Sequence, residues 1–100
     1  MIKLLATWNI QPGHEDEYFD FTVREFAPGV MRLGLRPSEA WYTVYGDAPQ
    51  ILMGFVADDL DAMVEALKSP EWEELHGKLL GYVSDYRHKI VKASSRFQLF

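Results

Sequence analysis

The sequence predicts an α+β domain with the element order strand, helix, two-stranded hairpin, two helices, strand. Three observations predict it. Strand-like apolar runs occupy Ile2–Ile10 and Ile51–Ala57, apolar residues recur at helical spacing along 15–31 and 70–86, and a turn separates two strand patterns at 46–49. This order is the ferredoxin-like βαββαβ plan with an extra helix before the last strand. One hundred residues suit a single domain, 1–100, with one core and one four-stranded antiparallel sheet.

The first strand, Ile2–Ile10, carries apolar side chains on both faces. Side chains alternate along a strand, so Lys3, Leu5, Thr7 and Asn9 share one face. That face is mixed in polarity, which predicts a strand covered on both sides with a special environment around Thr7 and Asn9. We assign the other face to contact with a second copy of the chain; it carries Ile2, Leu4, Ala6, Trp8 and Ile10.

A turn at 11–14 precedes a helix predicted over 15–31. Acidic residues at 15–17 favour its N-terminus, where the helix dipole stabilises negative charge. Pro28-Gly29 predicts an end or a kink near the last turn. The predicted inward stripe of this helix consists of Phe19, Val23, Phe26 and Val30. Tyr18, Phe21 and Thr22 widen it.

A hairpin follows a connection at 33–37. Its strands are predicted over 38–45 and Ile51–Ala57, joined by the turn residues Gly46-Asp47-Ala48-Pro49. Asp58 or Asp59 then caps a short helix that carries Leu60, Met63, Val64 and Leu67.

The next helix begins with a clear start signal. Ser69 suits the N-cap, Pro70 suits the first helical position, and acidic residues occupy the first turns. Trp72, Leu75 and Leu79 recur at helical spacing, which predicts a helix over 70–86. A last strand is predicted over 88–100. In this plan the first strand is central, beside the third and fourth, and the helices cover one sheet face. The uncovered face then predicts a homodimer.

Composition excludes several classes of function. A net charge of −5 without a basic run argues against nucleic-acid binding. Absence of cysteine excludes disulfides and thiolate metal sites, and no segment approaches the ~20 apolar residues of a membrane span. No signal peptide precedes the first strand, so we expect a cytoplasmic protein. The three histidines show no metal-ligand spacing, and hydrolase, P-loop and dinucleotide-binding motifs are absent.

His76 and Asn9 are the candidate catalytic residues. His76 either packs at the edge of an amphipathic helix or binds a ligand and transfers a proton, because histidine titrates near neutral pH. Asn9 either caps the turn after its strand or orients a ligand through its amide. The functional interpretation requires both side chains to face one cavity. Further ligand-binding candidates are Thr7, Trp41, Trp72 and Tyr82, although tryptophans serve more often as core or interface anchors.

In element order nearly the whole chain resembles the dimeric α+β barrel superfamily, which includes antibiotic-biosynthesis monooxygenase-like, haem-degrading, NIPSNAP-like and EthD-like proteins. The most specific marks are Pro12-Gly13-His14-Glu15 after the first strand and Ser69-Pro70-Glu71-Trp72 leading to His76. The resemblance implies a homodimer of two facing sheets, with a ligand cavity between sheet and helices in each subunit. In the haem-degrading branch, His76 matches the iron ligand and Asn9 a pocket asparagine. The position of that branch's tryptophan is Ala66 here, which argues against haem degradation.

Three hypotheses about function follow. The first is a cofactor-independent, monooxygenase-like enzyme that acts on a small aromatic or apolar molecule, with His76 as base. The second is a module that binds such a ligand, or haem, without turnover. The third is a dimeric scaffold or stress-associated protein whose pocket is filled by its own aromatic side chains.

Overall fold

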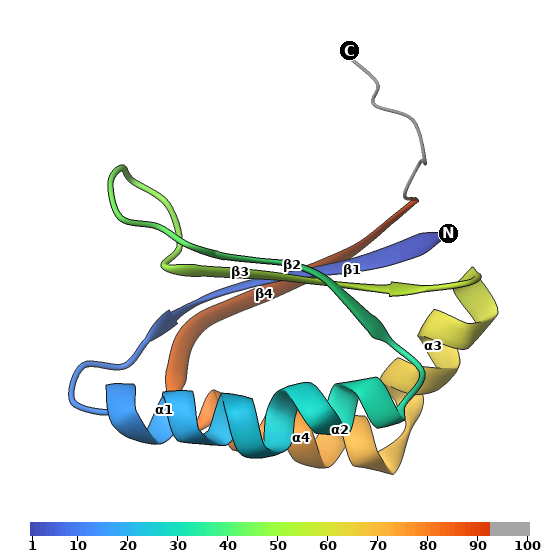
Figure 1. Ribbon diagram of the computed structural model, residues 1–100, viewed down its shortest axis with the longest axis horizontal. Coiled ribbons are helices and arrows are strands. Elements are labelled where there is room, and N and C mark those ends of the chain that lie inside the picture. Colours follow the sequence, from blue (N-terminus) through green and yellow to red (C-terminus); the bar gives the residue numbers. More distant parts are fainter. Residues whose placement is uncertain (93–100) are drawn as a thin grey trace.

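The computed structural model describes residues 1–92 and has two layers, a sheet and a set of helices that covers one of its faces (Figure 1). The elements follow the predicted order and confirm the ferredoxin-like α+β fold. They are β1 (Ile2–Ile10), α1 (Glu15–Phe21), η1 (Thr22–Phe26), α2 (Ala27–Arg32), β2 (Arg36–Tyr42), β3 (Ile51–Ala57), α3 (Leu60–Lys68), α4 (Pro70–Leu80) and β4 (Val83–Lys92).

The sheet order is β2-β3-β1-β4, with every neighbouring pair antiparallel. The predicted central position of β1 beside β3 and β4 is therefore confirmed. On the face without helices, the register aligns side chains in rows across the strands. One row is Trp41, Leu52, Thr7 and Arg87, and the next is Glu39, Gly54, Leu5 and Lys89.

The face of β1 that carries Trp8 packs against the helices, so its assignment to contact with a second copy was wrong. Trp8 is fully buried, and its Nε1–H donates to the Tyr18 hydroxyl at 3.0 Å. Leu4, Ala6 and Ile10 are buried with it. Alternation correctly separated the two faces of this strand. Their polarity did not identify the covered one, because both carry apolar residues.

The helix predicted over 15–31 is one continuous run that contains a π-helical turn, η1, between α1 and α2. Pro28 has no N–H, and its ring would collide with the carbonyl four residues earlier in a regular α-helix. The wider turn immediately precedes Pro28; at its end the Ala27 N–H bonds the Thr22 carbonyl. The run therefore continues through Pro28 instead of ending there.

The inward stripe of this run differs from the prediction. Phe26 and Val30 are buried as expected, but Phe19 and Val23 are 48% and 72% exposed. The covered positions are instead Tyr18, Phe21, Phe26 and Val30.

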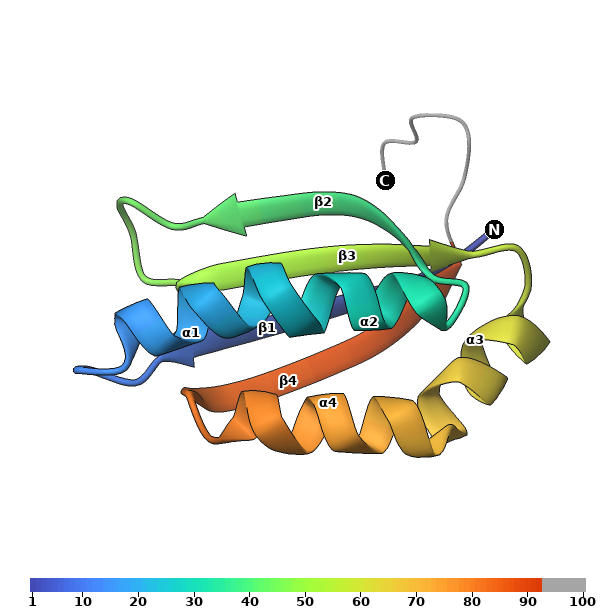
Figure 2. The ribbon, with the colours of Figure 1, turned by 60° about the horizontal axis from the view of Figure 1, so that its bottom comes forward.

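Strand β2 spans Arg36–Tyr42. It therefore begins two residues earlier and ends three residues earlier than the strand predicted over 38–45. Its register with β3 shifts between Pro37 and Glu39. Beyond Tyr42 the chain closes a longer loop, in which the Thr43 N–H donates to the Gln50 carbonyl at 2.8 Å. Figure 2 shows that β2 lies outside the area that the helices cover, and nearly all of its residues are exposed.

The predicted helix starts are confirmed. The Asp59 carboxylate accepts the Ala62 N–H at 2.8 Å, and the Ser69 hydroxyl accepts the Trp72 N–H at 3.2 Å. Helix α4 ends at Leu80, however, rather than at 86. Gly81 follows it, and β4 already begins at Val83, which pairs with Ile10. The predicted last strand over 88–100 thus begins earlier, and its part at 93–100 lies outside the described residues.

Candidate functional site

Aromatic rings fill the space beneath the centre of the sheet. Trp8 packs edge-to-face on Tyr18 and Phe26, and Phe26 in turn contacts Phe55 and Trp72. All five side chains are buried. A ligand cavity between sheet and helices cannot occupy this central region, so any such site must lie toward the edges of the sheet.

His76 lies at one of these edges, in an aromatic cluster between α4 and β4. Its ring stacks on Trp72, one helical turn earlier, with centroids 5.5 Å apart, and meets Tyr86 of β4 edge-on at 4.5 Å. The Tyr86 hydroxyl lies 2.9 Å from Nδ1 of His88. Nε2 of His76 is buried and bonds no described residue, so one strong hydrogen-bonding atom is unused.

Burial governs the titration of this cluster. It lowers the pKa of His76, and the nearby charge of His88 lowers it further. Burial also raises the pKa of the Tyr86 phenol. At neutral pH the cluster therefore holds a neutral imidazole beside a protonated phenol. A neutral imidazole is the form that accepts a proton from a ligand or binds an uncharged hydrogen-bonding group.

The lowered pKa of His76 predicts that acid destabilises the fold. The unfolded chain binds a proton near pH 6.5, the usual value, and the folded chain only at lower pH. The free energy of unfolding should therefore fall as pH drops below about 6.5, until the folded-state pKa is passed. We expect His76→Phe, which keeps the ring stack, to flatten this slope in urea unfolding between about pH 7.5 and 5.5. Leu60→Ala, a non-titrating change at an exposed site of α3, should keep the slope; an unchanged slope in His76→Phe would contradict the assignment.

Asn9 lies on the opposite face of the sheet from His76, so the structure does not bring the two candidate catalytic residues together. The Asn9 amide donates to Asp85 at 3.3 Å and accepts the Gln50 N–H at 2.9 Å. These bonds tie β1 to the end of the hairpin loop and to β4. Asparagine at this position thus has a sufficient structural role.

The four ligand-binding candidates also divide between the two faces. Thr7 and Trp41 share a row of the uncovered face, where Trp41 is 65% exposed and donates its Nε1–H to Glu39. Trp72 is buried under α4, and Tyr82 packs on Phe21 at the edge of the core. No single cavity collects them.

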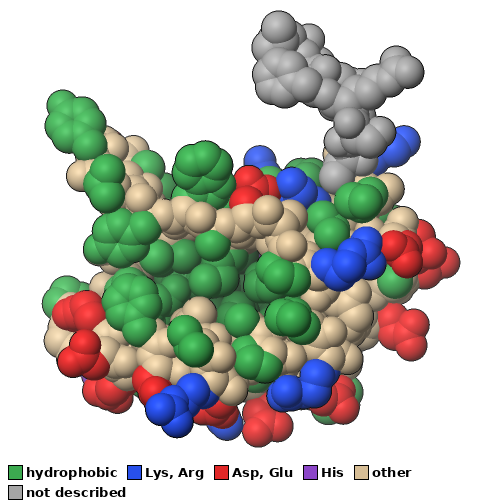
Figure 3. All heavy atoms as spheres, viewed as in Figure 1, with side chains coloured by type: hydrophobic (Ala, Val, Ile, Leu, Met, Phe, Trp, Pro, Cys, Tyr) green, Lys and Arg blue, Asp and Glu red, His purple; other side chains and the backbone are tan. Residues whose placement is uncertain are grey.

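A second edge of the sheet carries an apolar trough, between β2 and the α1–η1–α2 run. In that run, Glu25 and Gly29 face α4, and Phe21 contacts Tyr82 just after α4 ends. The opposite side of the run faces β2, and it carries the exposed Phe19 and Val23. Figure 3 shows hydrophobic side chains gathered in a hollow on this side, between sheet and helix. We call this hollow the β2 trough; its helical stripe is Phe19, Val23, Ala27 and Met31, and β2 contributes Ala40 and Tyr42 from its helix-side face.

The β2 trough was not predicted from the sequence. The stripe at 19 and 23 was interpreted as core, because period alone cannot distinguish an inward face from a face left uncovered by a short helical layer. The sequence did contain one signal that Phe19 and Val23 lie outside the core. Tyr18 and Phe21 already formed an apolar face that could fill the core without Phe19 and Val23.

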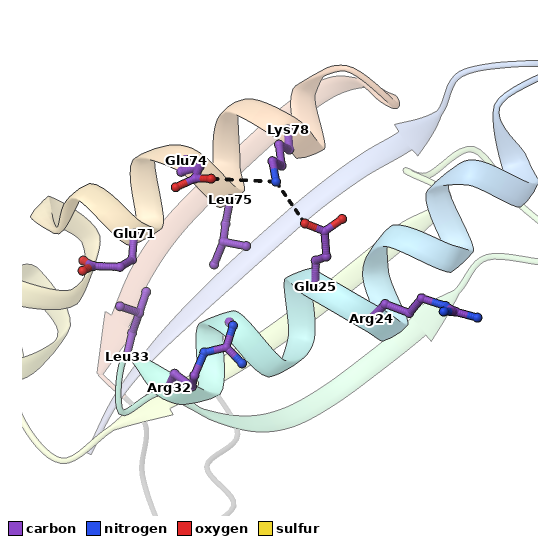
Figure 4. A pocket seen from close by; sticks show the side chains of 9 residues that line it. Arg24, Glu25, Arg32, Leu33, Glu71, Glu74, Leu75 and Lys78 are labelled. Carbon is purple, nitrogen blue, oxygen red and sulfur yellow. Dashed lines mark hydrogen bonds and ion pairs between the residues drawn. The ribbon is translucent and has the colours of Figure 1, made fainter.

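A charged groove separates α4 from the η1–α2 run (Figure 4). It has a volume of about 540 Å³ and an apolar floor that includes Leu75. Lys78 bridges its two walls, at 3.0 Å from Glu25 and 3.8 Å from Glu74. The hydrogen bond to Glu25 raises the pKa of Lys78. Because these charges neutralise one another, the groove is best interpreted as a helix–helix contact.

Neither a metal nor haem has a prepared site among the described side chains. Within residues 1–92 no three His, Asp or Glu side chains gather as metal ligands. Haem ligation by His76 would need room for a whole porphyrin at Nε2, but that nitrogen is buried and the ring packs against Trp72 and Tyr86. The residues present thus do not fit haem. In the same part of the chain, no helix has the length and apolar character needed to cross a bilayer.

Comparison with solved structures identifies the fold. A NIPSNAP domain protein from Burkholderia xenovorans superposes with a TM-score of 0.73 at 14% identity, over 98% of this chain and 99% of that one. An EthD-family protein from Bacillus halodurans superposes with a TM-score of 0.75 at 17% identity, over 94% of this chain and 99% of that one. The chain has the fold of these proteins.

A candidate antibiotic biosynthesis monooxygenase from Deinococcus radiodurans has the same fold, with a TM-score of 0.69 at 15% identity over 100% of this chain and 99% of that one. The resemblance seen in the element order is therefore confirmed at the level of fold. No protein-family model matches the sequence, and no curated protein matches it. At these low sequence identities the superpositions establish a shared fold but not a shared reaction.

Proposed function

We propose that this protein is a homodimer, joined through its uncovered sheet faces, that binds a small apolar or aromatic molecule in the β2 trough of each subunit. The observation that carries the ligand-binding part is the exposed stripe at Phe19 and Val23. Two large apolar side chains one turn apart, facing a hollow with aromatic walls, favour binding of a molecule that removes them from water.

The dimer is supported by the uncovered face of the sheet. Leu5 and Leu52 are half-buried at its centre although no described element covers it, and Val56 continues the apolar patch along β3. The hairpin loop rises from the sheet on this side (Figure 1), and its Val44 and Tyr45 are almost fully exposed. A second sheet packed on this face would bury Leu5, Leu52, Val44 and Tyr45, and a two-fold axis would place the same residues on both sides.

Binding in the β2 trough is testable with 1-naphthol, a neutral aromatic probe. We expect Val23→Asp to weaken its affinity at least tenfold, because a carboxylate would lie on the apolar wall against the ring. Isothermal titration of the wild type and the variant gives the comparison. Val64→Asp on α3 is the matched control and should bind like the wild type. Equal affinities in all three proteins would contradict the trough as the site.

Catalysis is a second candidate function, favoured by the neutral His76 with its unused Nε2. As in a cofactor-independent monooxygenase, His76 would remove a proton from an acidic polyphenol, and the resulting carbanion would react with dioxygen. The substrate carbon is then oxidised from CH₂ to a carbonyl; one oxygen atom enters the product and the other leaves as water.

A general base of this kind raises the reaction rate about 10²–10⁴-fold. We expect oxygen uptake with anthrone-type polyphenols to fall by at least that lower factor in His76→Phe. His88→Phe removes the neighbouring histidine without removing the base and serves as control. Uptake that His76→Phe leaves unchanged would exclude His76 as the base.

A further inference from the structure

The uncovered sheet face has a cationic end that neither the dimer nor the trough requires. The four strands carry five of the ten Lys and Arg of the chain but only two of the fifteen Asp and Glu. Most acidic residues lie on the helices. A protein with a net charge of −5 thus presents a predominantly positive sheet.

On the uncovered face, two of these cations are unpaired; Lys92 pairs with Ile2 and so lies on the other face. Lys3 bonds Glu39 at 2.8 Å, and Arg36 bonds Asp58 at 3.0 Å, so both are neutralised locally. Arg87 and Lys89, on neighbouring rows of β4, form no ion pair with any carboxylate of residues 1–92. Unpaired cations of this kind attract an anion from solution.

The two cations border an open hollow of about 460 Å³. Leu5 and Leu52 form its apolar floor, and the Thr7 side chain lies between Leu52 and Arg87 in one row. A second hollow, of about 400 Å³, shares Thr7 and Arg87 and ends at Asp47 and Asp85. Those carboxylates repel an anion, which confines the anionic group to the end near Lys89.

From this arrangement we infer that the hollow binds a small amphipathic anion, a carboxylate or sulfonate on a short apolar body. The anionic group lies between Arg87 and Lys89, where the guanidinium of Arg87 suits the planar geometry of a carboxylate. The apolar body lies on Leu5 and Leu52. The inference extends the proposed dimer, in which the two hollows would face each other and the bound anions would offset repulsion between two positive sheets.

Octanoate and octanamide test the site, because they differ only in charge. We expect isothermal titration to show octanoate binding at least tenfold more tightly than octanamide, and Arg87→Ser to remove this difference. Arg32→Ser is the matched control: it removes an arginine from the groove beside α4, and the difference should remain. Equal affinity for the two probes in the wild type, or a preference that Arg87→Ser leaves intact, would overturn the inference.

Sedimentation separates this inference from the dimer. In the wild type, saturating octanoate should lower the dimer dissociation constant about tenfold, and in Arg87→Ser it should leave that constant unchanged. A monomer that binds octanoate through Arg87 would overturn the dimer and support the site. A dimer that binds octanoate no better than octanamide would overturn the site and support the dimer.

Discussion

Trp8→Ala should cost about 3–5 kcal/mol of unfolding free energy, the range for removing a large buried aromatic side chain. Trp8 has no exposed surface; it stacks on Tyr86 at 5.8 Å and packs edge-to-face on Tyr18 and Phe26. Its removal also leaves the Tyr18 hydroxyl without the N–H it accepts. The total free energy of unfolding of a domain of this size is about 5–15 kcal/mol, so the variant should be close to unfolded at 37 °C.

Urea unfolding followed by circular dichroism measures this loss. Trp8→Phe keeps an aromatic ring in the core and removes the N–H donor and part of the indole, so we expect a smaller loss, about 1–2 kcal/mol. Leu60→Ala, at an exposed site of α3, should change the free energy by less than about 0.5 kcal/mol. A Trp8→Ala protein as stable as Leu60→Ala would show that this tryptophan is not the centre of the core.

The second large effect concerns the dimer. Leu52→Lys should raise the dimer dissociation constant at least 100-fold, or about 2.7 kcal/mol. Leu52 is half-buried at the middle of the uncovered face, in the same row as Arg87. In a two-fold interface the substitution acts twice, and each new ammonium adds to a surface that is already positive.

The folded subunit should tolerate Leu52→Lys, because the side chain points away from the helices. Circular dichroism and thermal unfolding should confirm an intact fold at low protein concentration. Leu60→Lys is the control for adding a lysine, since Leu60 lies on α3 in the helical layer and should leave association unchanged. Equal dimer dissociation constants for Leu52→Lys and the wild type would exclude this face as the interface.

Much of the fold could be predicted, because local chemistry determined it. Ser69 and Asp59 have side chains that satisfy the first free N–H groups of a helix, and both act as caps. The end of α4 could not be predicted by periodicity. Val83 continues the helical spacing of Leu75 and Leu79, yet pairing with Ile10 draws it into β4. Tertiary contact decided this boundary.

The candidate site was harder to predict, because it depends on which faces remain uncovered. His76 was identified correctly as lying near the inner face of its helix, but its neighbours Tyr86 and His88 lie on a strand that was expected to begin at 88. With β4 starting at Val83, those two side chains turn toward α4. The position of the β2 trough depends on how little of the sheet the helical layer covers, which residue spacing does not encode.

Sedimentation equilibrium of the wild-type chain tests the sheet-to-sheet association most directly. Across about 1–50 µM, at moderate salt, we expect a species of twice the 11.6 kDa chain mass that dissociates only on strong dilution. A chain that sediments at 11.6 kDa throughout this range would contradict the association of the two sheets and, with it, the proposed homodimer.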